Sequence, residues 1–257
     1  MKSKAAEKIL QELESGYDLI AEKFSETRAF MWQDLEFVKN IVKPESRVLD
    51  FGCGNGRLAK FLGGNFSEYV GVDISQKLIE IAQKNNRQFG PRVRFFKMDP
   101  SSEKLPLKEN YFDVIFSIAV FHHFPSAEYR LQRAKELYRA LRPGGKLTIS
   151  VWNLWQRRFW KYHLTSFWNK LFGDSKLDWK DFYLPFKTEE KIFERYHHAF
   201  SKKEIESLFS KAGFEKISLW KSRKGNIIYL GQKVGNNRFL KKSKKSMRNF
   251  FRGISGN

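Results

Sequence analysis

The sequence predicts an α/β fold in which helices cover both faces of a mostly parallel sheet. Apolar runs typical of buried strands alternate with helical segments between residues 47 and 152. Turns rich in glycine or proline separate these segments, and 257 residues are enough for one large core. Strand–helix–strand alternation of this kind produces parallel neighbours in one sheet.

The first 43 residues are predicted to form two helices that precede this domain and cap its site. Apolar residues recur at helical spacing over 4–24 and again over 29–42, on either side of a polar break at 25–28. Pro44 ends the helical region, because proline disfavours helix in the residue before it.

The main domain is predicted over residues 44–234, and its elements follow in order. Strands are expected at 47–52, 68–75, 93–99, 111–120 and 146–152, with helices at 56–64, 75–85 and 127–141. An aromatic and basic insertion at 153–200, read as a lid, interrupts the pattern. A helix at 201–214 and an antiparallel hairpin of strands 215–222 and 226–234 complete a seven-stranded sheet with an antiparallel edge strand.

Charge is the most unusual feature of the composition. Lys and Arg number 48 against 28 Asp and Glu, which gives a net charge of +20. This balance favours a polyanionic partner, either nucleic acid or an anionic membrane surface. The tail at 235–257, predicted to be flexible, has basic residues and phenylalanines that suit a phosphate backbone, a membrane surface or plain solvent.

Other compositional features exclude several classes of protein. No apolar run reaches the roughly 18 residues that a membrane span needs. The N-terminus lacks the apolar segment of a signal peptide, and the single cysteine, Cys53, excludes an internal disulfide and a cysteine-rich zinc site. We therefore expect an intracellular, cytoplasmic protein.

The stretch VLDFGCGNG (48–56) is the strongest chemical signal, because its glycines come directly between a strand and a helix. Glycines there allow a tight turn and let a ligand approach the backbone. The next strand ends in Asp73, which is placed to accept hydrogen bonds from ribose hydroxyls. The predicted cofactor-binding residues, taken from the ends of four strands, are Asp50, Gly52, Gly54, Gly56, Asp73, Ile74, Met98, Asp99, Ser117 and Ala119.

These residues spell D-x-G-x-G-x-G, and the chain from about 17 to 234 resembles the class I S-adenosylmethionine-dependent methyltransferases, which have a Rossmann-like sheet. The LRPGG turn at 141–145 is part of the resemblance. It implies S-adenosylmethionine as the cofactor, with Asp50 near the ligand's ammonium. An α/β domain that has lost its cofactor is the structural alternative.

Three further segments are similar to one group in particular, the tRNA wobble-uridine carboxyl methyltransferases. They are 17–32, 117–152 and the stretch that runs from DFYLPF to KAGF. The resemblance implies methylation of the carboxylate of 5-carboxymethyluridine in tRNA, with a small activator subunit as a possible partner. A carboxylate nucleophile is already ionised at neutral pH, so it needs positioning groups rather than a base.

The positions carried over from this group supply those positioning groups. Arg28 is an alternative ligand for the cofactor's own carboxylate, and Trp32 and Tyr196 are expected to wall the site. In this chain His197 stands where the group has a tyrosine. The predicted catalytic set is Arg28, His122, His123, Arg195, Tyr196 and His198.

His122 and His123 are expected at the end of a strand, where adjacent side chains point to opposite faces. One of them should therefore face the pocket, and no metal site is predicted. Two other functions remain open from the residues alone. They are a small-molecule or lipid methyltransferase, such as one acting on a quinone precursor with the tail as a membrane tether, and a non-catalytic, cofactor-binding RNA module.

Overall fold

A computed structural model describes residues 3–173, 177–188 and 192–235. Its core is a seven-stranded sheet with the strand order β3-β2-β1-β4-β5-β9-β8. The strands are β1 (Arg47–Phe51), β2 (Glu68–Asp73), β3 (Val93–Lys97), β4 (Phe112–Ile118), β5 (Leu141–Val151), β8 (Glu215–Lys221) and β9 (Ile227–Gln232). The first five run parallel, and β9 is antiparallel to both β5 and β8. This confirms the predicted fold class, with the antiparallel strand inserted next to the edge.

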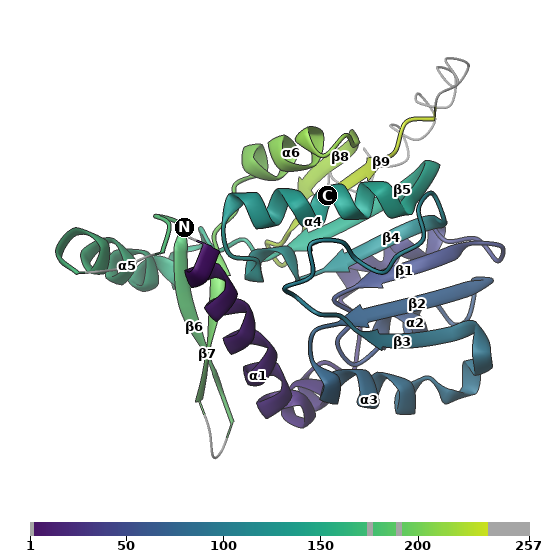
Figure 1. The fold of residues 1–257 in the computed structure, drawn as a ribbon, viewed down its shortest axis with the longest axis horizontal. Helices are drawn as coiled ribbons and strands as arrows, with labels where there is room; N and C mark the ends of the chain where they lie inside the picture. Colours follow the sequence, from purple (N-terminus) through teal and green to yellow (C-terminus); the bar gives the residue numbers. More distant parts are fainter. Residues whose placement is uncertain (1–2, 174–176, 189–191, 236–257) are drawn as a thin grey trace.

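Helices cover both faces of this sheet (Figure 1). They are α1 (Ser3–Thr27), α2 (Arg57–Phe61), α3 (Gln76–Asn85), α4 (Ala127–Ala140) and α6 (Lys202–Lys211), whereas α5 (Trp160–Phe172) belongs to the insertion after β5. Alternation along the central strands divides the core into two layers. Leu49 packs in the cluster that contains residues of α4 and α6, whereas Val48 packs with residues of α2 and α3. Both side chains are fully buried, as expected of a strand covered on two faces.

The N-terminal region differs in detail from the two predicted helices. α1 continues through the polar stretch at 25–27, and the second segment is a 3₁₀ helix at Gln33–Asn40. Leu35 and Val38 of that segment are buried against the sheet. None of the helices within the described residues is long and apolar enough to cross a membrane.

The expectation that His122 and His123 end a strand is wrong. β4 stops at Ile118, and Ala119 adopts a positive φ of 61° while its N–H donates to the Ser150 carbonyl. The chain then makes a 3₁₀ turn at Phe121–His123. Strand alternation therefore does not apply, and both imidazoles are buried, with ring centroids 4.4 Å apart.

The insertion after β5 folds into elements that were not predicted. α5 is followed by a two-stranded antiparallel sheet of β6 (Asp181–Lys187) and β7 (Ile192–His198). Figure 1 shows this hairpin beside α1, with α5 extending away from the main sheet. Except for Gly235, the predicted basic tail lies outside the described residues, and so do the three alternatives given for it, a phosphate backbone, a membrane surface and plain solvent.

Candidate active site

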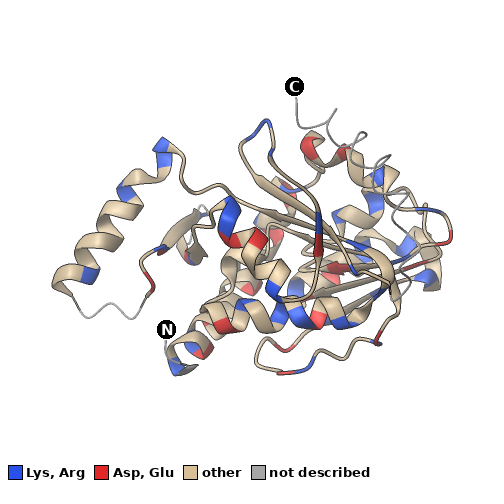
Figure 2. Cartoon of the chain, turned by 90° about the horizontal axis from the view of Figure 1, so that it is seen from above, with Lys and Arg blue, Asp and Glu red and all other residues tan. Residues whose placement is uncertain are grey.

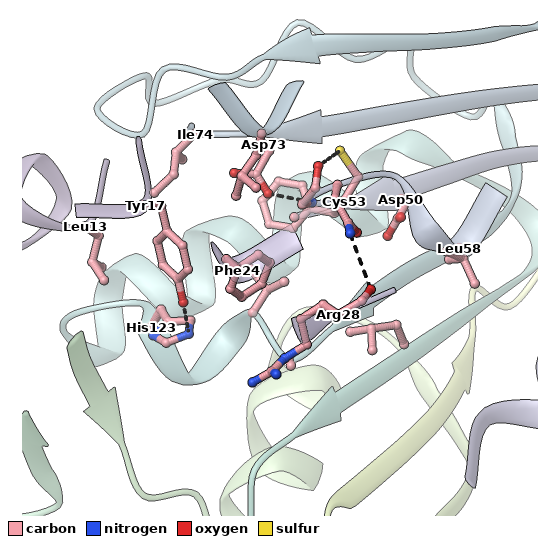
Figure 3. A pocket seen from close by; sticks show the side chains of 18 of the residues that line it. Leu13, Tyr17, Phe24, Arg28, Asp50, Cys53, Leu58, Asp73, Ile74 and His123 are labelled. Carbon is pink, nitrogen blue, oxygen red and sulfur yellow. Dashed lines mark hydrogen bonds between the residues drawn. The ribbon is translucent and has the colours of Figure 1, made fainter. Parts of the chain in front are cut away.

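A cavity lies at the carboxyl ends of the parallel strands, where ligands bind in open α/β sheets. Its floor comes from the segments that follow β1, β2 and β4, and its walls come from α1, the end of β5 and β7. Figure 3 shows side chains of α1 and of the segments after β1, β2 and β4 around one space. Packing of α1 and the β6–β7 hairpin against the sheet therefore creates the site.

The glycine loop forms one side of the cavity, and two of its glycines, Gly54 and Gly56, have different roles. All three glycines have positive φ, of 82°, 54° and 73° for Gly52, Gly54 and Gly56. A Cβ at Gly54 would meet only Phe24, at 3.5 Å, so this residue leaves open space for a ligand. A Cβ at Gly56 would lie 2.5 Å from Nδ2 of Asn86, and Gly56 does not line the cavity. Gly56 therefore allows the loop to pack against α3.

Asp73 joins the loop to the end of β2. Its carboxylate accepts hydrogen bonds from the Gly54 N–H at 2.9 Å and from the Ser75 N–H at 3.0 Å. Burial raises the pKa of Asp73, and these backbone donors oppose the rise. The carboxylate lines the cavity, where hydroxyl groups of a sugar are suitable partners.

Asp50 is the second acidic group of the cavity. The Tyr69 hydroxyl donates to its Oδ2 at 2.6 Å. Burial raises the pKa of Asp50 to about 7, although this hydrogen bond and the Arg57 guanidinium lower it. A cationic ligand group beside Asp50 would favour the ionised form.

Three arginines, Arg28, Arg57 and Arg195, line the same cavity. Arg195 is only 5% exposed, and its guanidinium lies over the rings of Trp152 at 5.4 Å and Phe186 at 5.1 Å. Its Nε has no hydrogen-bond partner, and no carboxylate within the described residues forms an ion pair with it. Burial, followed by the charge of Arg195, lowers the pKa of Arg28. A buried cation without an anionic partner is costly, so this side of the cavity suits an anionic ligand.

Tyr17 and His123 form a hydrogen-bonded pair (Figure 3), and Arg195 lines the same cavity beside Tyr17. The Nδ1 of His123 lies 2.9 Å from the Tyr196 carbonyl, which only accepts, so Nδ1 carries the proton. The Tyr17 hydroxyl then donates to Nε2 at 2.9 Å. Burial, followed by the charge of Arg195, lowers the pKa of His123 to about 3, so the ring is neutral. These two hydrogen bonds link α1 to the 3₁₀ turn at Phe121–His123 and to β7, and so hold in place the wall of the cavity that contains Arg195.

His122 and His197 lie behind His123, outside the lining of the cavity. The ligand nitrogens of the three histidines are within 4.8 Å of one another, and the Nε2 atoms of His122 and His197 have no partner among the described residues. Burial lowers the pKa of both rings, and the positive charge of Arg195 adds to the shift. The same charge opposes a metal ion at this position.

Two other predicted catalytic residues lie outside the cavity. His198 is held between Asp181 at 2.6 Å and Glu204 at 2.7 Å, in a buried network between β6 and α6. Tyr196 is fully buried, and its side chain packs in the cluster under α1. Arg195 points into the cavity, whereas Tyr196 and His198 lie on the opposite face of β7, because successive side chains of a strand alternate. The side chains of Tyr196 and His198 therefore support the hairpin.

Most predicted cofactor residues do line the cavity, and three do not. Gly56 packs against α3, Asp99 bonds to the nearby Ser101 and Ser102, and Ser117 is buried in β4. The lining includes the predicted residues Arg28, His123, Arg195, Asp50, Gly52, Gly54, Asp73, Ile74, Met98 and Ala119, together with Trp32.

Sequence reasoning missed Tyr17, Arg57 and Trp152. Tyr17 belongs to a stripe of α1 residues, Leu10, Leu13, Tyr17 and Phe24, at helical spacing. That spacing, with a tyrosine among apolar side chains, was a usable signal. The sequence pattern also places Trp152 at the end of the fifth strand, beside the predicted site. Its contact with Arg195, however, depends on the position of the β6–β7 hairpin.

The chain matches known proteins over the region that builds this site. Residues 48–145 match the methyltransferase domain family. A tRNA (carboxymethyluridine(34)-5-O)-methyltransferase of Schizosaccharomyces pombe is 34% identical over 220 residues, which cover 77% of this chain and 86% of the relative. The tRNA (carboxymethyluridine(34)-5-O)-methyltransferase ALKBH8 of Macaca fascicularis is 42% identical over 142 residues, or 54% of this chain. The chain covers only 20% of that longer relative.

Solved structures share the fold. A methyltransferase described as S-adenosylmethionine-dependent, from Methanosarcina mazei, has a TM-score of 0.63 at 22% identity, covering 80% of this chain and 99% of its own. A Pyrococcus horikoshii protein has a TM-score of 0.61 at 26% identity, and the match covers 78% of this chain and 89% of the solved chain. A complex of the Haloferax volcanii Trm112 methyltransferase activator with a methyltransferase has a TM-score of 0.61 at 16% identity. The match covers 88% of this chain and 99% of the solved chain.

Proposed function

The chain belongs to the S-adenosylmethionine-dependent methyltransferase family that includes the tRNA (carboxymethyluridine(34)-5-O)-methyltransferases, and on that premise we propose that it methylates a carboxylate in tRNA. The substrate we propose is the carboxymethyl group of a 5-carboxymethyl wobble uridine. The buried guanidinium of Arg195, which has no carboxylate partner within the described residues and whose Nε is free of hydrogen bonds, is the observation that carries this choice.

The residues of the cavity fit the cofactor of this family. The open space beside Gly54 admits a ligand close to the backbone, and Asp73 can accept hydrogen bonds from ribose hydroxyls. Asp50 is placed to pair with the ammonium of the amino-acid part, and Ile74 and Met98 provide apolar walls. When bound, S-adenosylmethionine supplies a methyl group that its positive sulfur has already activated.

The protein's own contribution to transfer is positioning. A carboxylate is ionised near neutral pH, so it needs no base, and neutral His123 is not required to remove a proton. Arg195 offers charged donors that can hold carboxylate oxygens, and Trp152 and Phe186 keep its guanidinium in place. Arg28 provides the second positive charge, for either the substrate or the cofactor carboxylate.

Incubation with labelled S-adenosylmethionine and total tRNA, followed by nucleoside mass spectrometry, tests this function. We expect a methyl ester on a wobble uridine. Arg195→Ala should lower transfer at least 100-fold with cofactor affinity unchanged by calorimetry, whereas Arg157→Ala, at an exposed position of the insertion, should retain activity. Labelled methyl groups found only in lipid, or an active Arg195→Ala variant, would contradict the proposal.

We further propose that a small activator subunit of the Trm112 type assists the enzyme. The Haloferax volcanii neighbour was solved as a complex with such an activator. In the described sheet β3 is an edge strand, and Phe96 on it is 49% exposed beside an apolar pocket that includes Val70 and Leu105. Activity that rises on addition of a Trm112-type protein, and does not rise in Phe96→Asp, would support this assembly.

A further inference from the structure

Helix α5 packs against the protein through Tyr162, His163 and Ser166 and turns an apolar side to solvent. The Ser166 hydroxyl donates to the Asp181 carbonyl at 2.7 Å, and His163 bonds to the Leu154 carbonyl at 2.9 Å. These contacts use the inner side of the helix. Six large apolar side chains are exposed, namely Trp160 (60%), Leu164 (60%), Phe167 (44%), Trp168 (53%), Leu171 (53%) and Phe172 (76%).

These six residues form one stripe, which we call the α5 face. Their spacing of three or four residues places them on a single side of the helix. Trp179, 61% exposed, extends the patch, with its ring 5.9 Å from that of Phe167. Figure 1 shows α5 projecting from the body beyond the β6–β7 hairpin. Contiguous apolar surface of this kind marks an interaction site.

The charge around α5 favours an anionic partner. Residues 154–173 contain four basic residues, Arg157, Arg158, Lys161 and Lys170, and no acidic residue. In Figure 2 the charged residues on this helix are all blue. The whole chain carries a net charge of +20, which adds a long-range attraction to any anionic surface.

We propose that the α5 face docks on an anionic lipid bilayer, with the helix lying in the plane of the interface. Trp, Phe and Leu on one side of a helix that also carries basic residues are the side chains of interfacial helices. Lys161 lies on the exposed part of the helix, and Arg157 and Arg158 precede it, where they can reach lipid phosphates. The helix has 13 residues, enough to lie on a membrane but not to span one.

An RNA strand fits the α5 face less well. Six of the nine exposed residues of the helix are large and apolar and only Lys161 is basic, which suits insertion among lipid chains better than a row of contacts to a nucleic-acid backbone. Trp168 and Phe172 are already stacked on each other, with ring centroids 5.4 Å apart and an angle of 14°. A second copy also fits less well, because pairing two such helices would bring together cations without an acidic partner on either helix.

Vesicle flotation of the full chain tests the proposal. We expect binding to phosphatidylcholine vesicles that contain phosphatidylglycerol, and at least tenfold weaker binding to phosphatidylcholine alone. Leu164→Asp combined with Leu171→Asp should lower binding to the anionic vesicles at least tenfold, because both side chains are more than half exposed and enter the lipid. Leu19→Asp, at an exposed leucine on α1 (47%), is the matched control and should bind like the wild type.

Calorimetry with S-adenosylmethionine verifies that the double variant is folded. Brominated lipids should also quench tryptophan fluorescence of the wild-type chain and not that of the double variant. Absence of flotation, or equal flotation of the double variant, would overturn the proposal. It would also be overturned if the double variant instead abolished a dimer seen by light scattering, or weakened tRNA binding without any vesicle binding by the wild type.

Discussion

Arg195, Tyr17 and His123 form a chain of contacts in which each residue constrains the next. The tautomer of His123 is set by the Tyr196 carbonyl, and the Tyr17 hydroxyl must therefore donate to the histidine and turn its lone pairs outward. Burial raises the pKa of Tyr17, and the nearby Arg195 guanidinium, which can donate to that oxygen, opposes the rise. Tyr17 is thus a positioning residue for Arg195.

Tyr17→Phe should raise the KM for the carboxylate substrate about tenfold and leave cofactor affinity unchanged. The substitution removes the hydroxyl between His123 and Arg195 and leaves a buried acceptor unpaired, which costs about 1–3 kcal/mol. Steady-state kinetics and calorimetry would measure the two effects. Tyr162→Phe in the insertion serves as the control, and an unchanged KM in Tyr17→Phe would remove the positioning role.

Asp50 should make the protein less stable as the pH rises through the range in which its carboxyl ionises. Its pKa is raised by burial from 3.8 to about 7, so the unfolded chain loses this proton at lower pH than the native state. The penalty develops between about pH 4 and pH 7 and amounts to at most about 4 kcal/mol.

Asp50→Asn keeps an acceptor for Tyr69 and removes the charge, so its stability relative to the wild type should rise across that interval. Urea unfolding of both proteins at pH 4.5 and pH 8 without cofactor would measure the difference. An equal difference at the two pH values would show that Asp50 titrates normally. The variant should also bind S-adenosylmethionine more weakly at pH 8, because the ammonium loses its counter-ion.

At the level of the elements, the glycine loop contacts the cofactor cavity on one side and packs against α3 on the other. Gly54 and Gly56 both have positive φ, so alanine at either position bears a similar backbone strain of about 1–2 kcal/mol. Their surroundings differ, because Gly54 faces the cavity and Gly56 touches Asn86 and Ala82 of the α3 region.

Gly54→Ala should therefore lower cofactor affinity at least tenfold with only the loss of stability due to strain. Gly56→Ala should lose about 2–4 kcal/mol of stability, because its Cβ would lie 2.5 Å from Asn86. Calorimetry and urea unfolding of the pair would separate the two effects. Equal loss of stability in both variants would mean that the α3 contact can relax.

For the molecule as a whole, the net charge of +20 should dominate its encounter with tRNA. Binding that neutralises several phosphates releases counter-ions, so affinity should fall at least tenfold between 50 and 200 mM salt. Filter binding over this range would give the slope. A salt-independent affinity would contradict a largely electrostatic tRNA interface.

Local patterns in the chain were sufficient for the main sheet, the glycine loop and the two acidic strand ends, Asp50 and Asp73. Each depends on a strand period or on residues adjacent in sequence, and parallel strands bring their carboxyl ends to one edge. The turn at His122 and His123 escaped prediction, because the positive φ of Ala119 accompanies a hydrogen bond to Ser150, which is distant in sequence.

The meeting of Tyr17, Trp152 and Arg195 was decided by tertiary packing alone, since α1, β5 and β7 are far apart in the sequence. The same holds for the α5 face. Helical spacing reveals an apolar stripe but not its direction, and only the contacts of Ser166 and His163 show that it faces outward. Periodicity records which residues share a side, whereas the neighbour on that side depends on how distant segments pack.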